Sequence, residues 1–580
     1  MAGTTLDIHK LLEADEVGMS IATRWQQWGE SFRSKWIEEK KELRNYVYAT
    51  DTSTTSNSDL PWFNSTTTPK LTQIFDNLKA NYVAALFPNA EWMRWEASTD
   101  DSGSNTAAKA RTIQSYMRNK VEQSDFENTA DAWINDWLLT GNCFGTVEWV
   151  EEFAEQPDGE FITSYIGPRA VRISPFDIAF DPTAAHFKNS PKIIRSILKL
   201  GEVRKMIENG SDEYQAVFDK MLNNRRQVAG TTNATKSDGY IADGFQSIQQ
   251  YYGSDYVEVL TFYGDIYDVH EDVLYENHKI VVVDRSYVIE KGPIANWLGR
   301  SPIYHSGWRT RPDNLYGMGP LDNLVGLQYR IDHLENLKAD VFDQIAFPIL
   351  KIQGDVQDFE YAPGTRIYLG EEGDVAPMVP DTTALNADFQ IQNLQNTMEE
   401  MAGAPRQAMG FRTPGEKTAF EVSALENASG RIFQHKAEQF ERDFLTPLLN
   451  AMLESARRNM DVSDTIRVLD DETGLAIFDS ITRQDIKGSG RIRPIGASHF
   501  AERAQRIQNL TQMLQVKADP TVGVHLSGKK IAEIIAMELG EIEIYGENIT
   551  INEQLKTQKA AQDAEAQNIE DLSMQAEIGT

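Results

Sequence analysis

Two runs of apolar residues at helical spacing, separated by a β-rich insert, constrain the fold of this chain more than any other feature of its sequence. The first run has apolar residues every three or four positions from Leu321 to Ile345 and ends before Pro348. At 1.5 Å per residue, a helix of this length is about 38 Å long. The second run extends from Leu385 to Met401 with the same spacing. We therefore expect two helices that lie beside each other as the two sides of a hairpin.

The insert between the two helices is predicted to form short strands. Turn-forming residues divide it at Gly354, at Pro363-Gly364 and at Glu372-Gly373. Seven carboxylates against two cations give residues 348–383 a formal charge of −5. Such a face suits a basic partner. The carboxylates that we expect to serve in docking are Asp355, Asp358, Glu360, Glu371, Glu372 and Asp374.

A short loop follows the second helix. Residues 403–417 contain three glycines and two prolines, so they continue neither a helix nor a strand. Their charged residues, which sum to +2 within a strongly acidic chain, are Arg406, Arg412, Glu416 and Lys417. In one interpretation, the two arginines pair with Glu399 and Glu400 and only hold the loop in place.

The longest helical run begins after this loop. Apolar residues keep helical spacing over 418–460, and Pro447 within the run predicts a kink. Residues 461–500 contain a short β-like interval, and helical spacing returns in 501–580. Beyond Asn552 the apolar face becomes sparse, which is typical both of a helix that needs neighbours and of a frayed tail.

Residues 1–317 alternate helical and β-rich runs, which predicts an α+β body in a chain that is mainly helical. A helix is expected from Leu71 to Leu86, after a cap at Thr68 and a proline in the first turn at Pro69.

Helix gives way to sheet later in this body. A helical run over 107–139, interrupted near Ser124, ends at Gly141, and residues 143–149 are predicted to form a strand. Further β-rich runs lie at 161–180, 257–267 and 279–289. The polar, glycine-rich interval 223–247 is expected to be a surface loop.

Composition limits the class of protein. The net charge of −31, from 56 Lys and Arg against 87 Asp and Glu, argues against a main role in static nucleic-acid binding. With Cys143 as the single cysteine, the chain forms neither an intramolecular disulfide nor a thiolate zinc cage. No run approaches the roughly 18 apolar residues of a membrane span, and the first residues lack a leader pattern. We expect a soluble protein, made in the cytoplasm, that contacts no membrane.

No motif indicates catalysis, a cofactor or a metal. The stretch 230–237 is similar to a phosphate-binding loop but lacks the second glycine. Gly317-Met318-Gly319 fits a turn before a helix better than a dinucleotide fingerprint, and His270 with His278 is only a weak metal candidate. Cys143 is expected to be a small buried hydrophobe. We predict that the protein is not an enzyme.

Three short motifs occur in order along the chain. Ser174-Pro175-Phe176-Asp177 is followed by Asp181-Pro182, and Tyr316-Gly317-Met318-Gly319-Pro320 opens the first helix of the hairpin. Thr418-Ala419-Phe420-Glu421-Val422 starts the longest helix. With the order of helices and strands, these loose motifs make most of the chain resemble the portal, or head-to-tail connector, proteins of tailed bacteriophages, particularly short-tailed ones. The family has a long crown at its C-terminal end. The sparse apolar face beyond Asn552 departs from that pattern.

The resemblance implies the parts of a portal subunit. These are a wing body (1–317), a stem helix (318–347), a β-rich clip (348–384), a returning stem helix (385–402), a tunnel loop (403–417), a long kinked helix (418–460), wing strands (461–500) and a helical C-terminal crown (501–580). It also implies that the clip carboxylates dock the packaging motor and tail adaptors. The tunnel-loop cations Arg406, Arg412 and Lys417 would then make weak contacts with DNA phosphates.

The implied function is that of a ring of twelve copies at a capsid vertex of the virion, assembled in the host cytoplasm. Double-stranded DNA would pass through it during packaging and ejection, and acidic walls would hold no phosphate tightly. The implied partners are the major capsid protein, the terminase packaging motor, tail adaptor proteins and the DNA itself. Two alternatives remain: another virion structural or scaffold protein that self-associates through its helical hairpin, and an acidic hydrolase.

Overall fold

A computed structural model of the chain describes residues 17–48, 66–88, 92–97, 106–155, 161–181, 184, 186–208, 212–228, 255–268, 273–294, 296–311, 314–357, 366–370, 372–378, 382–402, 432–460, 463–469 and 476–496. The chain divides into two compact units, residues 1–464 with 481–495 and residues 465–480 with 496–580. β14 (Ser463–Leu469) pairs with β15 (Ala476–Thr482), and this pair contains most of the described residues of the second unit. Both helices and sheets are present, so the predicted α+β class is confirmed.

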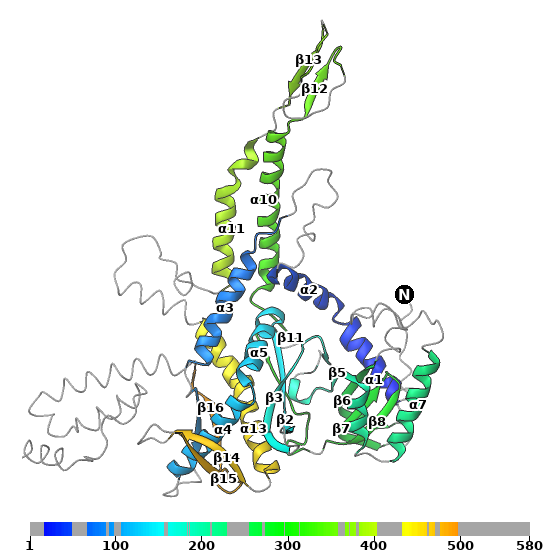
Figure 1. The fold of residues 1–580 in the computed structure, drawn as a ribbon, viewed down its shortest axis with the longest axis vertical. Coiled ribbons are helices and arrows are strands. Elements are labelled where there is room, and N and C mark those ends of the chain that lie inside the picture. Colours follow the sequence, from blue (N-terminus) through cyan, green and yellow to red (C-terminus); the bar gives the residue numbers. More distant parts are fainter. Residues whose placement is uncertain are drawn as a thin grey trace, which may run out of the picture. The chain divides into compact units, whose positions relative to one another are not determined.

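A five-stranded antiparallel sheet forms one part of the first unit (Figure 1). In spatial order its strands are β4 (Ile178–Phe180), β5 (Lys192–Lys199), β6 (Tyr256–Asp268), β7 (Val273–Val283) and β8 (Tyr287–Pro293). Side chains of a strand alternate between the two faces of its sheet. Ile280 and Val282 of β7 lie on one face and pack against α1 (Val17–Trp25). Val281 and Val283 lie on the other face and pack against α6 (Leu200–Glu208) and α7 (Asp212–Val228).

The predicted loop over 223–247 is wrong at its start, because α7 continues to Val228. The guanidinium of Arg225 is buried and donates to the carbonyl oxygen of Tyr256 at 2.6 Å. This contact with β6 holds the last turn of α7 in place, which the polar composition alone does not predict. Residues 229–247 lie outside the described part of the chain.

A second sheet and two helices form the other part of the core. The interrupted helix is present as α4 (Thr106–Gln123) and α5 (Phe126–Thr140), and the three-stranded sheet consists of β3 (Phe161–Ile173), β2 (Asn142–Glu155) and β9 (Ile303–Gly307). Trp133 and Trp137 of α5 are fully buried. The Trp137 ring lies 4.5 Å from Trp308 and 4.8 Å from Phe440. These aromatic contacts join α5 to segments far away in the sequence.

The expected helix over Leu71–Leu86 is confirmed as α3 (Lys70–Leu86), which follows η2 (Gln26–Ser31) and α2 (Ser34–Tyr48) in chain order. Its predicted start is wrong, because Pro69 is the residue before the first turn and no side chain of its own segment caps the helix. The backbone N–H of Leu71 instead donates to Oε1 of Gln328 at 3.2 Å.

The long helix departs from α geometry where Pro447 predicts a kink. Residues 432–440 are α-helical, η8 (Glu441–Leu445) is a π-helical turn, and α13 (Thr446–Asn459) continues the run. Proline has no N–H for the α-helical hydrogen bond, which explains why the irregular turn lies directly before it. Residues 418–431 lie outside the described residues.

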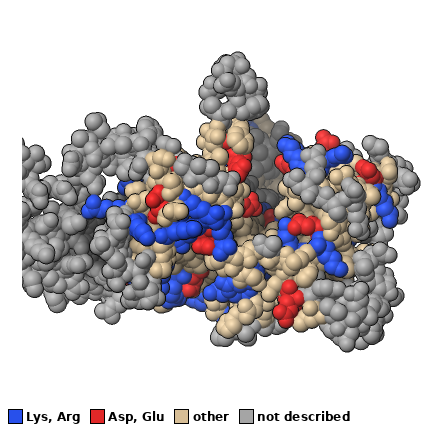
Figure 2. Space-filling view, turned by 90° about the horizontal axis from the view of Figure 1, so that it is seen from below, with Lys and Arg blue, Asp and Glu red and all other residues tan. Residues whose placement is uncertain are grey.

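A pairing of distant strands completes the unit. β1 (Met93–Ala97) pairs antiparallel with β16 (Gly490–Pro494), and β10 (Arg309–Arg311) pairs with β11 (Asn314–Met318). On the exposed face of the first pair, Arg94 lies opposite Arg493. Figure 2 shows Lys and Arg side chains gathered on one face of the molecule, with Asp and Glu scattered among them.

Candidate functional site: a helical hairpin with a β tip

The predicted order of helix, β insert and returning helix is present. α10 (Val325–Ala346) and α11 (Asp388–Met401) contact each other and lie side by side (Figure 1). Between them in sequence, β12 (Leu350–Gln353) pairs antiparallel with β13 (Asp374–Pro377). The predicted order of helix, β-rich insert and returning helix is therefore confirmed, with β12 and β13 as short strands of the insert.

Two 3-10 turns make both helices start later than expected. η6 (Asp322–Leu324) precedes α10, and η7 (Thr382–Ala387) precedes α11. At the first of these turns, the Asp322 carboxylate accepts the N–H of Gly319 at 2.8 Å and pairs with the buried ammonium of Lys40. Such side-chain bonds to the local backbone compete with the first turn of an α-helix.

A buried polar ladder joins α10 to the segment before α3. Gln328, Asp332 and Asn336 recur every four residues, and each is at most 1% exposed. Oδ1 of Asp332 accepts the N–H of Thr68 at 2.9 Å, and Oδ1 of Asn336 accepts the N–H of Thr66 at 2.9 Å. Gln328 donates through Nε2 to the Thr68 carbonyl at 2.6 Å. Sequence reasoning missed this ladder, although three amide or carboxyl side chains at four-residue spacing were its visible signal.

Within this ladder, burial of the Asp332 carboxylate is energetically unfavourable. Burial raises the pKa of Asp332 to about 6, although hydrogen bonds from Thr68 and Gln328 act in the opposite direction. Its Oδ2 atom is buried and has no hydrogen-bond partner in the described structure. A charged carboxylate is poorly solvated in this position, because only neutral donors compensate it.

A nearly buried ion pair joins α3 to α11. Nζ of Lys70 lies 2.6 Å from Oε1 of Glu399, and their side chains are 11% and 6% exposed. The interpretation in which Glu399 binds an arginine of residues 403–417 is not tested, since that loop lies outside the described residues. The same holds for the proposed DNA contacts of Arg406, Arg412 and Lys417.

Large apolar side chains are exposed along the hairpin. More than half of the exposed large hydrophobic residues of the described structure lie within 329–401. They are Tyr329, Leu337, Phe342, Ile345, Phe347, Ile349, Ile352, Ile367, Tyr368, Leu369, Met378, Phe389 and Met401. Phe389 is 75% exposed and Phe347 is 65% exposed. Another protein surface can cover exposed apolar side chains of this kind.

Three of the six carboxylates predicted for docking lie on described residues of the tip. Asp355, Glu372 and Asp374 are exposed, as are the cations Lys351 and Arg366. Asp358, Glu360 and Glu371 lie outside the described residues. The described part of the tip therefore has three carboxylates against two cations, and the more acidic face predicted from the whole insert stays a prediction.

The described residues contain no group of three or more His, Cys, Asp or Glu residues placed to hold a metal ion. His278 is exposed, and His270 lies outside the described residues. Cys143 is buried in β2, and burial raises the pKa of its thiol well above the ordinary range. The thiol is therefore a packing group, as its position in a strand predicted.

A scan of the chain against protein-family models finds no match, and a search among curated proteins finds no significant similarity. Over the described residues, no helix has the length and apolar character needed to cross a membrane.

Proposed function

We propose that this chain is the portal protein of a tailed bacteriophage, a ring-forming subunit of the capsid vertex through which double-stranded DNA is packaged and ejected. The ring would hold twelve copies and contact the major capsid protein, the terminase motor and tail adaptors. In this proposal α10 and α11 are the stem, and β12 with β13 is the clip.

The observation that carries the proposal is the apolar surface of residues 329–401. Neighbouring copies would cover it, because exposed aromatic and aliphatic side chains gain free energy when another surface removes them from water. A ring is the closed form of a head-to-tail contact between identical subunits. The order of the elements along the chain supports the same assignment, since the helices flank the β tip as the resemblance implies.

The net charge favours a channel through which DNA slides over a protein that binds DNA tightly. Each copy carries −31, so a ring repels the phosphates of DNA at long range and offers few deep binding sites. DNA can slide past such a surface with little resistance.

The test is the assembly state of the full chain. Light scattering after size exclusion should show a large homo-oligomer, and negative-stain images should show closed rings. Replacing Phe342 and Ile345 of α10 with Gln should shift the population to smaller species, because both side chains are exposed and apolar. Met206→Gln, at an exposed methionine of α6, is the matched control and should assemble like the parent.

Two outcomes would contradict the proposal. A parent chain that stays monomeric at micromolar concentration and moderate salt has no self-association surface. Open or irregular oligomers that still depend on Phe342 and Ile345 would favour the alternative, a virion structural or scaffold protein that uses the hairpin for association alone.

A further inference from the structure

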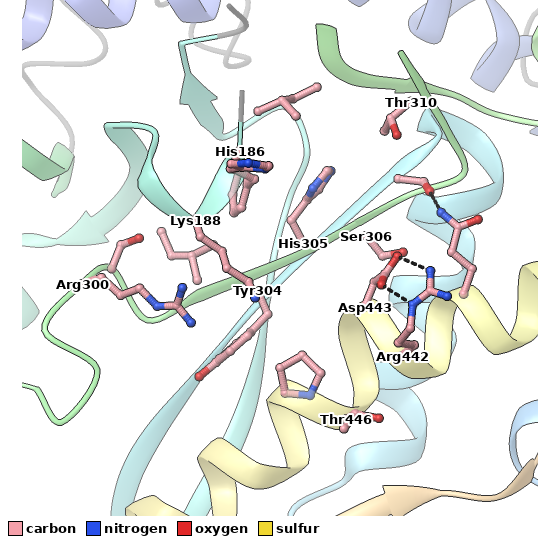
Figure 3. A pocket seen from close by; sticks show the side chains of 17 residues that line it. His186, Lys188, Arg300, Tyr304, His305, Ser306, Thr310, Arg442, Asp443 and Thr446 are labelled. Atoms are coloured by element: carbon pink, nitrogen blue, oxygen red, sulfur yellow. Dashed lines mark hydrogen bonds and ion pairs between the residues drawn. The ribbon is translucent and has the colours of Figure 1, made fainter. Parts of the chain in front are cut away.

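A cavity of about 670 Å³ lies in the α+β body (Figure 3). Most of the described residues that line it belong to three segments: η4 (Phe187–Asn189), residues 300–307 with β9, and the π-helical turn η8 with the start of α13. This volume is in the range of sites for small organic ligands. π-helical turns within α-helices are often found at functional sites.

The charged groups of the cavity wall are mostly basic. Lys188, Arg300 and Arg442 line it, and Asp443 is the only acidic residue among the described residues that line it. Asp443 is already neutralised, since its Oδ1 lies 2.9 Å from Nε of Arg442. Within the described residues, neither Lys188 nor Arg300 forms an ion pair. Two cations without an ion-pair partner among the described residues thus line one cavity of a chain whose net charge is −31.

A third basic side chain packs against Phe187, a residue of this wall. Lys192 is fully buried, and its Nζ donates to the carbonyl oxygen of Ser190 at 2.7 Å and lies 4.4 Å from the ring centre of Phe187. Burial lowers the pKa of Lys192 to about 7, and the charge of Arg300 acts in the same direction. The groups around Phe187 therefore include three basic side chains and no carboxylate that pairs with them in the described structure. An anion at this end would relieve the repulsion between Arg300 and Lys192.

Aromatic and apolar side chains form another part of the wall, beside polar residues such as Ser301, Ser306 and Thr310. Phe187 and Tyr304 line the cavity and are nearly buried, and Ile303, Leu315 and Pro447 complete this surface. Burial raises the pKa of Tyr304 to about 12, so its hydroxyl stays protonated and can donate a hydrogen bond. His305 adds no charge, because burial and Lys192 lower its pKa to about 3.

We propose that this cavity binds a small organic anion, a carboxylate or phosphate monoester carried on an aromatic or apolar body. Arg300 and Lys188 hold the anionic group, and the surface of Phe187, Ile303 and Tyr304 contacts the body. This site is independent of the portal assignment, because none of its lining residues belongs to the hairpin.

Calorimetric titration of the full chain tests the proposal with three probes: phenyl phosphate, benzoate and inorganic phosphate. We expect one site per chain for phenyl phosphate, for benzoate or for both, with a dissociation constant of about 1 mM or tighter. Inorganic phosphate should bind more weakly than phenyl phosphate because it lacks the apolar body. The two organic probes distinguish a phosphate ligand from a carboxylate ligand.

Variants locate the site. Arg300→Gln and Lys188→Gln should each weaken binding of the organic probe by about 10-fold or more, the scale of a lost hydrogen bond to a charged group. Lys205→Gln, at an exposed lysine of α6 outside the cavity, should bind like the parent. Thermal unfolding of each variant verifies that the fold is retained, which we expect because Arg300 uses only its backbone carbonyl in the local turn.

Three results would overturn the proposal. The first is no binding of either organic probe at millimolar concentration. The second is binding that Arg300→Gln and Lys188→Gln leave unchanged while the fold is intact. The third is inorganic phosphate binding as tightly as phenyl phosphate, since the apolar wall would then contribute nothing.

Discussion

At the scale of single residues, burial raises the pKa of two aspartates to a similar value although their partners differ. Burial raises the pKa of Asp136 to about 6 even though Arg172 binds both of its oxygens, at 2.5 and 2.7 Å. Asp332 reaches a similar pKa of about 6 with no cation in contact, only the N–H groups of Thr68 and Gln328. Removing the charge should therefore be less favourable at Asp136 than at Asp332, because it also removes the ion-pair partner of Arg172.

The first prediction concerns Asp332→Asn, which keeps the Oδ1 acceptor and removes the charge. The carboxyl ionises near pH 3.8 in the unfolded chain and near 6 in the folded one. As the pH rises between these values the unfolded chain loses its proton first, so the parent loses stability that the variant keeps. We expect the variant to be more stable than the parent by at most about 3 kcal/mol at pH 7, with little difference at about pH 4.

Urea unfolding at both pH values measures this difference. Asp76→Asn, at an exposed position of α3, is the control and should change stability by less than about 0.5 kcal/mol at either pH. An equal loss of stability at both pH values in Asp332→Asn would show that the carboxylate is needed for its geometry and carries no charge penalty.

At the scale of elements, the junction between α5 and β2 depends on one glycine. Gly141 ends α5 in the left-handed region, with a φ of 75°. A Cβ atom at this position would lie 2.5 Å from the carbonyl carbon of Met318 and 2.6 Å from the nitrogen of Gly319. The turn that leads into α10 therefore packs directly on the end of α5, and only glycine leaves room for it.

The second prediction follows from this packing. Gly141→Ala should lower stability by about 2–3 kcal/mol, because the added methyl group meets backbone atoms and the left-handed conformation is strained. Gly326→Ala, in α10 with no atom within 4 Å of the added Cβ, should raise stability by about 0.5–1 kcal/mol. Denaturant unfolding compares the two. Equal effects of the two substitutions would contradict the close packing at Gly141.

The third prediction concerns the β tip and depends on the proposed portal function. Reversing Glu371, Glu372 and Asp374 to Lys should weaken binding of a basic motor or adaptor surface while the ring persists, because the attraction at this face becomes repulsion. The matched control reverses Glu38, Glu39 and Glu42 of α2, which changes the net charge equally at another place.

Pull-down of both partners with intact rings measures this effect. Unchanged capture by the tip variant would contradict docking through its carboxylates. Equal loss in the α2 control would instead assign the effect to net charge.

At the scale of the whole molecule, a charge of −31 on each copy makes any local basic segment conspicuous. The fourth prediction is that replacing Arg406, Arg412 and Lys417 with Gln leaves assembly and the thermal midpoint nearly unchanged but alters DNA packaging or retention of the packaged genome. Weak phosphate contacts by a loop in the tunnel would have this effect, because they act only while DNA passes. Failure of the triple variant to form rings, or packaging and retention equal to the parent, would refute a DNA-facing role.

The sequence by itself determined those elements whose cause is local. The apolar spacing of α3 and α10, the break near Ser124 and the glycine stop at Gly141 all depend on residues within a few positions of one another. The hairpin with its β tip was predictable for the same reason, because periodicity and turn residues lie within each segment. The predicted docking carboxylates that fall on described residues lie in that tip.

Only the tertiary structure decided the contacts between remote segments. Gln328 caps the start of α3 from 257 positions away in the sequence. β1 pairs with β16, which is also far away in the sequence. The cavity behind Arg300 exists because η4, β9 and η8 meet, although no local pattern marks any of them as a binding segment. The physical reason is that hydrogen bonds, burial and charge repulsion act between groups that are close in space. Local spacing specifies the shape of each segment but leaves open which segment it meets.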